Sequence, residues 1–187
     1  MKYLKLFESF EDIKEICKKY VIKDYIINPD GSIDANKVNL YLSGLTKLPL
    51  KFNKVNGYFY CSNNELTSLE GSPVEVNGYF DCCNNEFTSF EFAPKIIRGD
   101  FYCECNNIKS FEYFPSFVKN DFICFSNPIF TVWILFEDWT KIELLNDFDI
   151  FRDEDTDIPA IFIDRLNDFL LTIGKDPVEK VDRYKNI

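Results

Sequence analysis

Histidine is absent from the 187-residue chain, methionine occurs once and glycine only seven times. Without histidine, the chain lacks the side chain that most often acts as general acid or base near pH 7, and the commonest metal ligand. Positive charge is also scarce, because 21 Lys and Arg stand against 31 Asp and Glu, a net charge of −10. Proteins that follow nucleic-acid phosphates neutralise them with Lys and Arg. These absences argue against an enzyme and against a nucleic-acid-binding protein.

The chain also lacks a long apolar run. The longest one, VWILF at 132–136, is far shorter than the roughly 20 residues that cross a bilayer. The first ten residues, MKYLKLFESF, turn polar before the apolar region of a secretory signal could form. We therefore expect a soluble, intracellular protein that does not bind membranes, long enough to bury a core as one domain.

Aromatic residues are abundant, and many of them recur at a fixed interval of 21 residues. Each unit reads apolar-x-(Leu/Cys)-x-x-Asn-x-apolar-x-x-apolar. The first two columns are Val38, Phe59, Phe80, Phe101, Phe122 and Leu40, Cys61, Cys82, Cys103, Cys124. The next three are Ser43, Asn64, Asn85, Asn106, Asn127; Leu45, Leu66, Phe87, Ile108, Ile129; and Leu48, Leu69, Phe90, Phe111, Val132. Alternating apolar residues predict a short strand with one buried face, and the Asn amide is expected to hydrogen-bond backbone groups at the following turn.

The segment that leads back to the next strand repeats at the same interval. Its two apolar columns are Phe52, Pro73, Pro94, Pro115 and Val55, Val76, Ile97, Val118. A third column, just before each new strand, consists of Gly57, Gly78, Gly99 and Asn120. Because Gly and Asn accept positive φ most readily, we expect a left-handed turn at this column.

These units resemble those of leucine-rich-repeat proteins encoded by tailed bacteriophages and giant viruses, which read like FYCSNNELTSLEGSPVEVNG. The similarity extends over about residues 23–132, and the lead-in YIINPDGSIDANKVNLYLSGLTKLPLKF resembles the usual start of such arrays. It implies an α+β solenoid with one short parallel β-sheet. It also implies a non-enzymatic interaction scaffold, located in the cytoplasm of an infected bacterial host.

The ends of a repeat array need caps, because terminal units otherwise expose apolar edges. Residues 1–36 are predicted to form a helix and a β-hairpin, 37–131 about five repeat units, and 132–187 a helical C-terminal cap, all in one structural domain. The N-terminal helix is indicated by Ser9 with Asp12 and by the spacing of Phe10, Ile13, Cys17 and Tyr20. The C-terminal helices are indicated by Val132, Leu135, Phe136, Trp139 and by Ile163, Leu166, Phe169, Leu170, Ile173, with Gly174 ending one helix and Pro177 opening another.

Four of the seven cysteines recur every 21 residues and are interpreted as small buried thiols that fill a narrow core. Stacked strands bring neighbouring cysteines within disulfide range, but their parallel Cβ vectors would strain a bridge. Zinc is disfavoured because Cys82 and Cys83 face opposite sides of a strand, although Cys103 and Cys105 form a C-x-C pair. A calcium loop at Asp153, Asp155, Asp157 and Asp164 is disfavoured because Ile158 replaces the required glycine. We predict no metal and no cofactor.

Residues that alternate with the buried ones should face outward and form a partner-binding face. They are Asn39, Tyr60, Asp81, Tyr102, Ile123 and Tyr41, Ser62, Cys83, Glu104, Phe125. Tyr and Phe anchor partners at low entropic cost, and Asp81 and Glu104 favour basic groups. The sequence thus predicts a monomer that binds a host or viral protein with a basic patch, and one role for such binding is to counter host defence.

Two other functions are considered. The first ten residues resemble the capsid-targeting peptide of internal head proteins in T-even-type phages, with Leu6, Phe7 and Glu8 at the protease cleavage motif. That resemblance implies a packaged virion protein; the alternative is an amphipathic start to the first helix. A catalytic-cysteine ligase is disfavoured because no cysteine follows Cys124 and the remaining tail is small for a catalytic domain.

Overall fold

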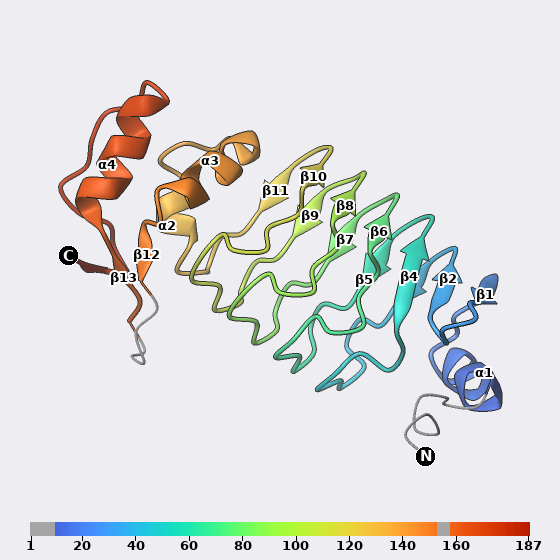
Figure 1. Ribbon diagram of the computed structural model, residues 1–187. Coiled ribbons are helices and arrows are strands. Elements are labelled where there is room, and N and C mark those ends of the chain that lie inside the picture. The colour runs from blue at the N-terminus through green and yellow to red at the C-terminus, as the bar shows by residue number, and fades with distance from the viewer. Residues whose placement is uncertain (1–9, 153–157) are drawn as a thin grey trace, which may run out of the picture.

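The computed structural model of the protein describes residues 10–152 and 158–187 (Figure 1). It is an α/β fold with parallel β-sheets and few helices. The N-terminal part consists of α1 (Phe10–Lys19), β1 (Tyr25–Ile27) and β2 (Ile33–Ala35). Strands of the repeats are β3 (Val38–Asn39), β4 (Phe52–Val55), β5 (Phe59–Tyr60), β6 (Glu75–Val76), β7 (Phe80–Asp81), β8 (Ile96–Ile97), β9 (Phe101–Tyr102), β10 (Phe117–Val118) and β11 (Phe122–Ile123).

The strands predicted at the Phe column form a five-stranded parallel sheet in the order β11-β9-β7-β5-β3. Neighbouring strands are offset by one repeat: Val38 pairs with Phe59, Phe59 with Phe80, Phe80 with Phe101 and Phe101 with Phe122. The predicted register is therefore confirmed. Because each strand is offset by a whole unit, identical columns are brought side by side across the sheet.

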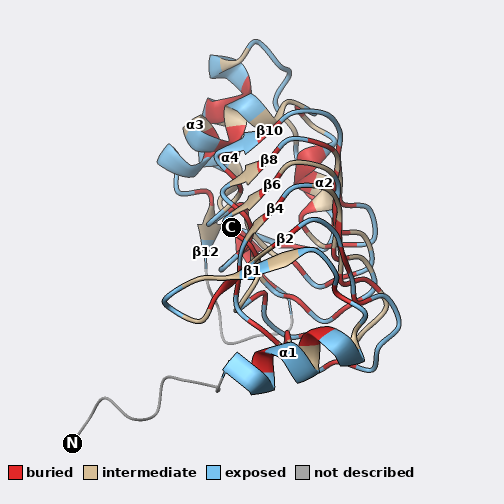
Figure 2. Cartoon of the chain, turned by 90° about the vertical axis from the view of Figure 1, so that its right-hand side faces the viewer, coloured by how far each residue is buried: buried red, intermediate tan, exposed pale blue. Residues whose placement is uncertain are grey.

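The segments between these strands form a second sheet, which the sequence analysis did not anticipate. Its six strands lie in the order β1-β2-β4-β6-β8-β10, all parallel except β1, which pairs antiparallel with β2. Seen from the N-terminal end (Figure 2), strands β2, β4, β6, β8 and β10 follow one another along the stack. The expectation of one sheet was wrong because the backbone groups of the return segments also need partners, and the neighbouring unit supplies them.

The core between the two sheets is a row of phenylalanine rings in contact, beside a column of thiols. Phe59 and Phe80 have ring centroids 5.6 Å apart, as do Phe80 and Phe101, and Phe101 and Phe122 are separated by 5.4 Å. The Cys column and the apolar columns after the Asn are buried as predicted. Buried apolar residues from Ile13 to Tyr184 belong to one connected cluster.

The asparagine column closes each turn as predicted. Asn106 donates from Nδ2 to the carbonyls of Cys82, Cys103 and Glu104 at 3.0–3.2 Å, and its Oδ1 accepts from the amide of Phe87 at 3.1 Å. Equivalent bonds surround Asn64, Asn85 and Asn127. Each amide thus links its own turn to the preceding unit.

The glycine column does not form the predicted left-handed turn. Gly57, Gly78, Gly99 and Asn120 have no positive φ; instead, a Cβ on Gly99 would lie 2.6 Å from the carbonyl group of Gly78. Glycine is needed here because the backbones of successive units touch. Positive φ occurs in two other columns, which are Leu42, Asn63, Asn84, Cys105, Ser126 and Gly71, Phe92, Tyr113.

At the N-terminal end of the stack, α1 covers the first units with Ile13 and Cys17 buried (Figure 1). Ser9, the proposed cap of this helix, lies outside the described residues. The helix ends in a Schellman arrangement, in which the amide of Ile22 donates to Cys17 and that of Val21 to Lys18. The predicted hairpin follows as β1 and β2, with Asp30 capping its turn through Ser32.

The C-terminal cap is not purely helical, so that part of the prediction was wrong. Its elements are α2 (Phe130–Trp133), the 3₁₀ turn η1 (Trp139–Lys141), α3 (Ile142–Asp147), β12 (Phe151–Arg152), β13 (Ala160–Ile161), α4 (Ile163–Thr172) and β14 (Lys185–Asn186). The single helix expected around Val132–Trp139 is interrupted between α2 and η1, and no helix begins at Pro177. Strands β12, β13 and β14 form a third sheet. Gly174, at φ +77°, ends α4 as predicted.

Candidate interaction surface

The outward face of the five-stranded sheet carries the residues predicted to bind a partner. Asn39, Tyr41 and Phe125 are exposed, and six others are partly exposed: Tyr60, Asp81, Cys83, Tyr102, Glu104 and Ile123. Ser62 is a correction, because only 2% of its surface is accessible. Its hydroxyl donates to Asp81 Oδ2 at 2.8 Å, so Ser62 orients a surface carboxylate and is not itself available to a partner.

A further column on this face was missed. The residues immediately before each strand are Lys37, Tyr58, Tyr79, Asp100 and Asp121, and all of them are at least partly exposed. Tyr58 stacks on Tyr60 with ring centroids 4.4 Å apart and planes 14° apart, and Tyr79 lies 6.5 Å from Tyr102. The sequence signal was present, since these residues precede the buried Phe column by one position and recur every 21 residues.

Carboxylates on the face are held by short hydrogen bonds. Asp81 Oδ1 accepts from the amide of Cys83 at 3.1 Å, and the thiol of Cys83 donates to Glu104 Oε2 at 2.6 Å. The hydroxyl of Tyr102 donates to Asp100 Oδ2 at 2.9 Å, and this bond, with burial, raises the pKa of Tyr102 to about 12. The Tyr102 phenol is therefore protonated at physiological pH, and these hydrogen bonds hold the neighbouring carboxyl groups in place.

The cysteines form neither disulfides nor a metal site among the described residues. All seven are free thiols. Burial raises the pKa of Cys61, Cys82, Cys103 and Cys124, which keeps these core thiols protonated and unreactive. Within residues 10–152 and 158–187, no three Cys, Asp or Glu side chains converge to hold a metal ion. Asp153, Asp155 and Asp157 of the disfavoured calcium loop lie outside the described residues.

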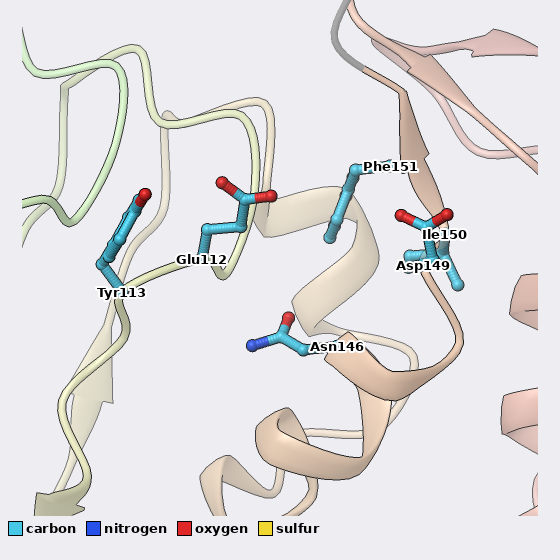
Figure 3. Close-up of a pocket in the computed structure, with 6 residues that line it drawn as sticks. All are labelled: Glu112, Tyr113, Asn146, Asp149, Ile150 and Phe151. Atoms are coloured by element: carbon cyan, nitrogen blue, oxygen red, sulfur yellow. The ribbon is translucent and has the colours of Figure 1, made fainter.

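A hollow of about 370 Å³ lies away from this face, where the last repeat meets the C-terminal cap (Figure 3). Glu112 and Tyr113 approach it from the repeat, Asn146 from α3, and Phe151 from β12. Asn146 donates to the carbonyl of Phe111 at 3.4 Å. Asp149, at the same hollow, accepts from Arg165 at 2.9 Å. The first bond joins α3 to the repeats, and the second lies within the C-terminal cap.

Comparison of the chain with protein-family models, curated proteins and solved structures gives no significant match. In the part of the chain that the structure describes, no helix has both the length and the apolar character needed to traverse a bilayer. Leu6, Phe7 and Glu8, the predicted protease motif, lie outside the described residues.

Proposed function

We propose that the protein is a leucine-rich-repeat solenoid of the phage and giant-virus type that acts as a non-enzymatic scaffold for binding another protein. The 21-residue strand offset, the parallel sheets and the asparagine ladder support the repeat assignment. Stacked units expose an extended surface on one side of the sheet, and repeat proteins bind their partners through such surfaces.

The observation that carries the proposal is the concentration of partly exposed tyrosines and carboxylates on the five-stranded sheet. Tyr58, Tyr60, Tyr79 and Tyr102 lie on three adjacent strands or directly before them. Tyrosine is enriched at the energetic centres of interfaces because it combines a rigid apolar ring with a polar tip. The neighbouring carboxylates favour a partner with a basic patch.

The test is quantitative capture of a partner from the natural host with the tagged protein. The variant Tyr60→Ala/Tyr102→Ala/Glu104→Lys should capture at least tenfold less partner than wild type. A matched control, Val74→Ala/Lys95→Glu/Tyr113→Ala, changes exposed residues outside this face and should capture as much as wild type. If the tyrosine variant captures as much partner as wild type and the control variant do, the partner binds elsewhere.

A further inference from the structure

A hollow of about 270 Å³ lies at the N-terminal border of the candidate surface, beside the edge strand β3. Its lining includes Tyr58, Lys37, Asn39 and Asp24, together with a second lysine, Lys23. Since β3 pairs only with β5 in this sheet, no described strand continues the sheet past the hollow. The hollow therefore lies where the loop between α1 and β1 meets the edge of this sheet.

Lys37 already places a cation against one of these rings. Its Nζ lies 5.6 Å from the Tyr58 ring centroid, and its stem passes close to the backbone of Gly57. Tyr58 is in turn stacked on Tyr60. An ammonium group within about 6 Å of an aromatic centroid is attracted by the ring quadrupole. The Tyr58 ring is thus a cation-binding position that the chain fills with its own side chain.

The carboxylate of Asp24 stands at the same hollow without an ion-pair partner among the described residues. Lys37 likewise makes no salt bridge within that part of the chain. A planar guanidinium can stack on a phenol ring and give two hydrogen bonds to a carboxylate, which an ammonium cannot do. A ring wall and a free carboxylate together favour arginine over lysine.

We propose that this hollow receives an arginine side chain of the partner, and that Lys37 is a resident cation which the arginine displaces. The inference deepens and rests on the proposed function, because it names the group recognised at the border of the same surface. Lys37 then sets the affinity in two ways: it occupies the ring and it repels an incoming positive charge. Removing its charge while keeping its length should tighten binding.

The probe is N-acetyl-arginine amide, titrated into the full-length protein while the ring resonances of Tyr58 and Tyr60 are followed by NMR. We expect saturable shifts, and a dissociation constant about two- to fivefold lower in Lys37→Met than in wild type. Asp24→Asn should raise the dissociation constant at least threefold. Lys95→Met, at an exposed position outside this face, should match wild type. N-acetyl-citrulline amide, the neutral isostere, should give no saturable shift.

Equal affinity of wild type and Lys37→Met, or binding of citrulline as tight as that of arginine, would overturn the inference. Amide spectra and thermal unfolding of each variant verify that it is folded. The two proposals fail separately. If the tyrosine variant loses partner capture but the arginine titration is negative, the proposed function is retained and the arginine site is rejected. If arginine binds but the tyrosine variant captures as much partner as wild type, the proposed function is rejected.

Discussion

At the scale of the residue, an asparagine at the same position makes the same hydrogen bonds in four of the five units. Asn85, Asn106 and Asn127 are buried, yet each satisfies carbonyls from two units and one amide. Buried backbone groups without partners are costly, so the amide replaces water at a turn that water cannot reach. Ser43, exposed in the first unit, cannot replicate these bonds, and there the amide of Ser43 instead donates to Asn64 of the next unit.

Asn106→Ala should lower the free energy of unfolding by at least about 3 kcal/mol, because several buried backbone groups lose their partner. Asn107→Ala, at the exposed neighbouring position, should change it by less than about 0.5 kcal/mol. Urea unfolding followed by circular dichroism measures both variants. Similar losses in the two variants would contradict the role given to the buried amide.

Tyr102 gives a pH-dependent prediction on the candidate surface. Its phenol should ionise near pH 12, because the hydrogen bond to Asp100 stabilises the protonated form. Since the folded-state pKa is raised, the stability from this bond is complete below about pH 10 and is lost as the pH rises through about 12. In Asp100→Asn, the Tyr102 Cζ resonance should titrate closer to pH 10, and an unchanged midpoint would show that the hydrogen bond to Asp100 does not cause the shift.

At the scale of the element, a strand could be predicted where its alternation of buried and outward residues recurs in every unit. The strands at the Phe column were predictable because the alternation of buried Phe59 and Cys61 with outward Tyr60 recurs in each unit. The six-stranded sheet was not, because its repeat segments bury residues three positions apart, such as Pro73 and Val76, and this spacing is not the alternation of a strand. The third sheet is assembled from residues far apart in sequence, such as Ala160 and Lys185, and no local pattern indicates that pairing.

Most residues of the candidate surface could be predicted from the sequence, but the contacts between them could not. Alternation correctly placed nine of its ten proposed residues at the surface, all except the buried Ser62. Stacking of Tyr58 on Tyr60 was not predictable, because it depends on side-chain rotation at the corner between the two sheets. The left-handed columns were also missed, since they hold Leu42, Phe92 and Cys105 where the usual preference for Gly or Asn gave no signal.

The end of α1 offers a stabilising substitution. Val21 is the left-handed residue of the Schellman motif, at φ 55°, a conformation that is unfavourable for a β-branched side chain. Val21→Gly should raise the free energy of unfolding by about 0.5–1 kcal/mol. Val74→Gly, at another exposed valine that lacks positive φ, should lower it. Thermal unfolding checks both, and destabilisation by Val21→Gly would contradict the strain argument.

The glycine column sets how closely units approach. Gly99→Ala should destabilise by at least about 2 kcal/mol, because its Cβ would meet the Gly78 carbonyl group at 2.6 Å. Asn120 occupies the same column in the last unit and already has a Cβ, with its amide 3.4 Å from the Gly99 oxygen. Asn120→Ala is therefore the matched control, expected within about 0.5 kcal/mol of wild type. Denaturant midpoints compare them, and equal effects would refute a steric limit at Gly99.

At the scale of the whole molecule, the repeats and the C-terminal cap share one buried cluster. Phe111, in the last complete unit, joins them through ring contacts with Trp133, Phe136 and Phe151 at 5.9–6.3 Å. Tyr184, near the end of the described chain, donates to the carbonyl of Lys109 at 2.7 Å. The cap is therefore coupled to the stack both by aromatic packing and by a buried hydrogen bond.

Phe111→Ala should lower the free energy of unfolding by about 3–5 kcal/mol. It should also separate the unfolding of the cap from that of the repeats. The two tryptophans, Trp133 and Trp139, both belong to the cap, so their fluorescence reports the cap while far-ultraviolet circular dichroism reports the whole chain. In wild type the two signals should change together. In Phe111→Ala the fluorescence should change at lower denaturant concentration, and coincident curves would contradict coupling through this ring.

The constant strand offset has a consequence for how such a chain can lengthen over evolutionary time. Each interior unit meets its two neighbours through the same pairs of columns, so an in-frame copy of 21 residues would find its partners already in place. A copy whose length is not a multiple of 21 residues would shift asparagines away from the carbonyls to which they donate. Gene duplication could thus widen the tyrosine-bearing surface in steps of about 4.8 Å while both ends keep their caps.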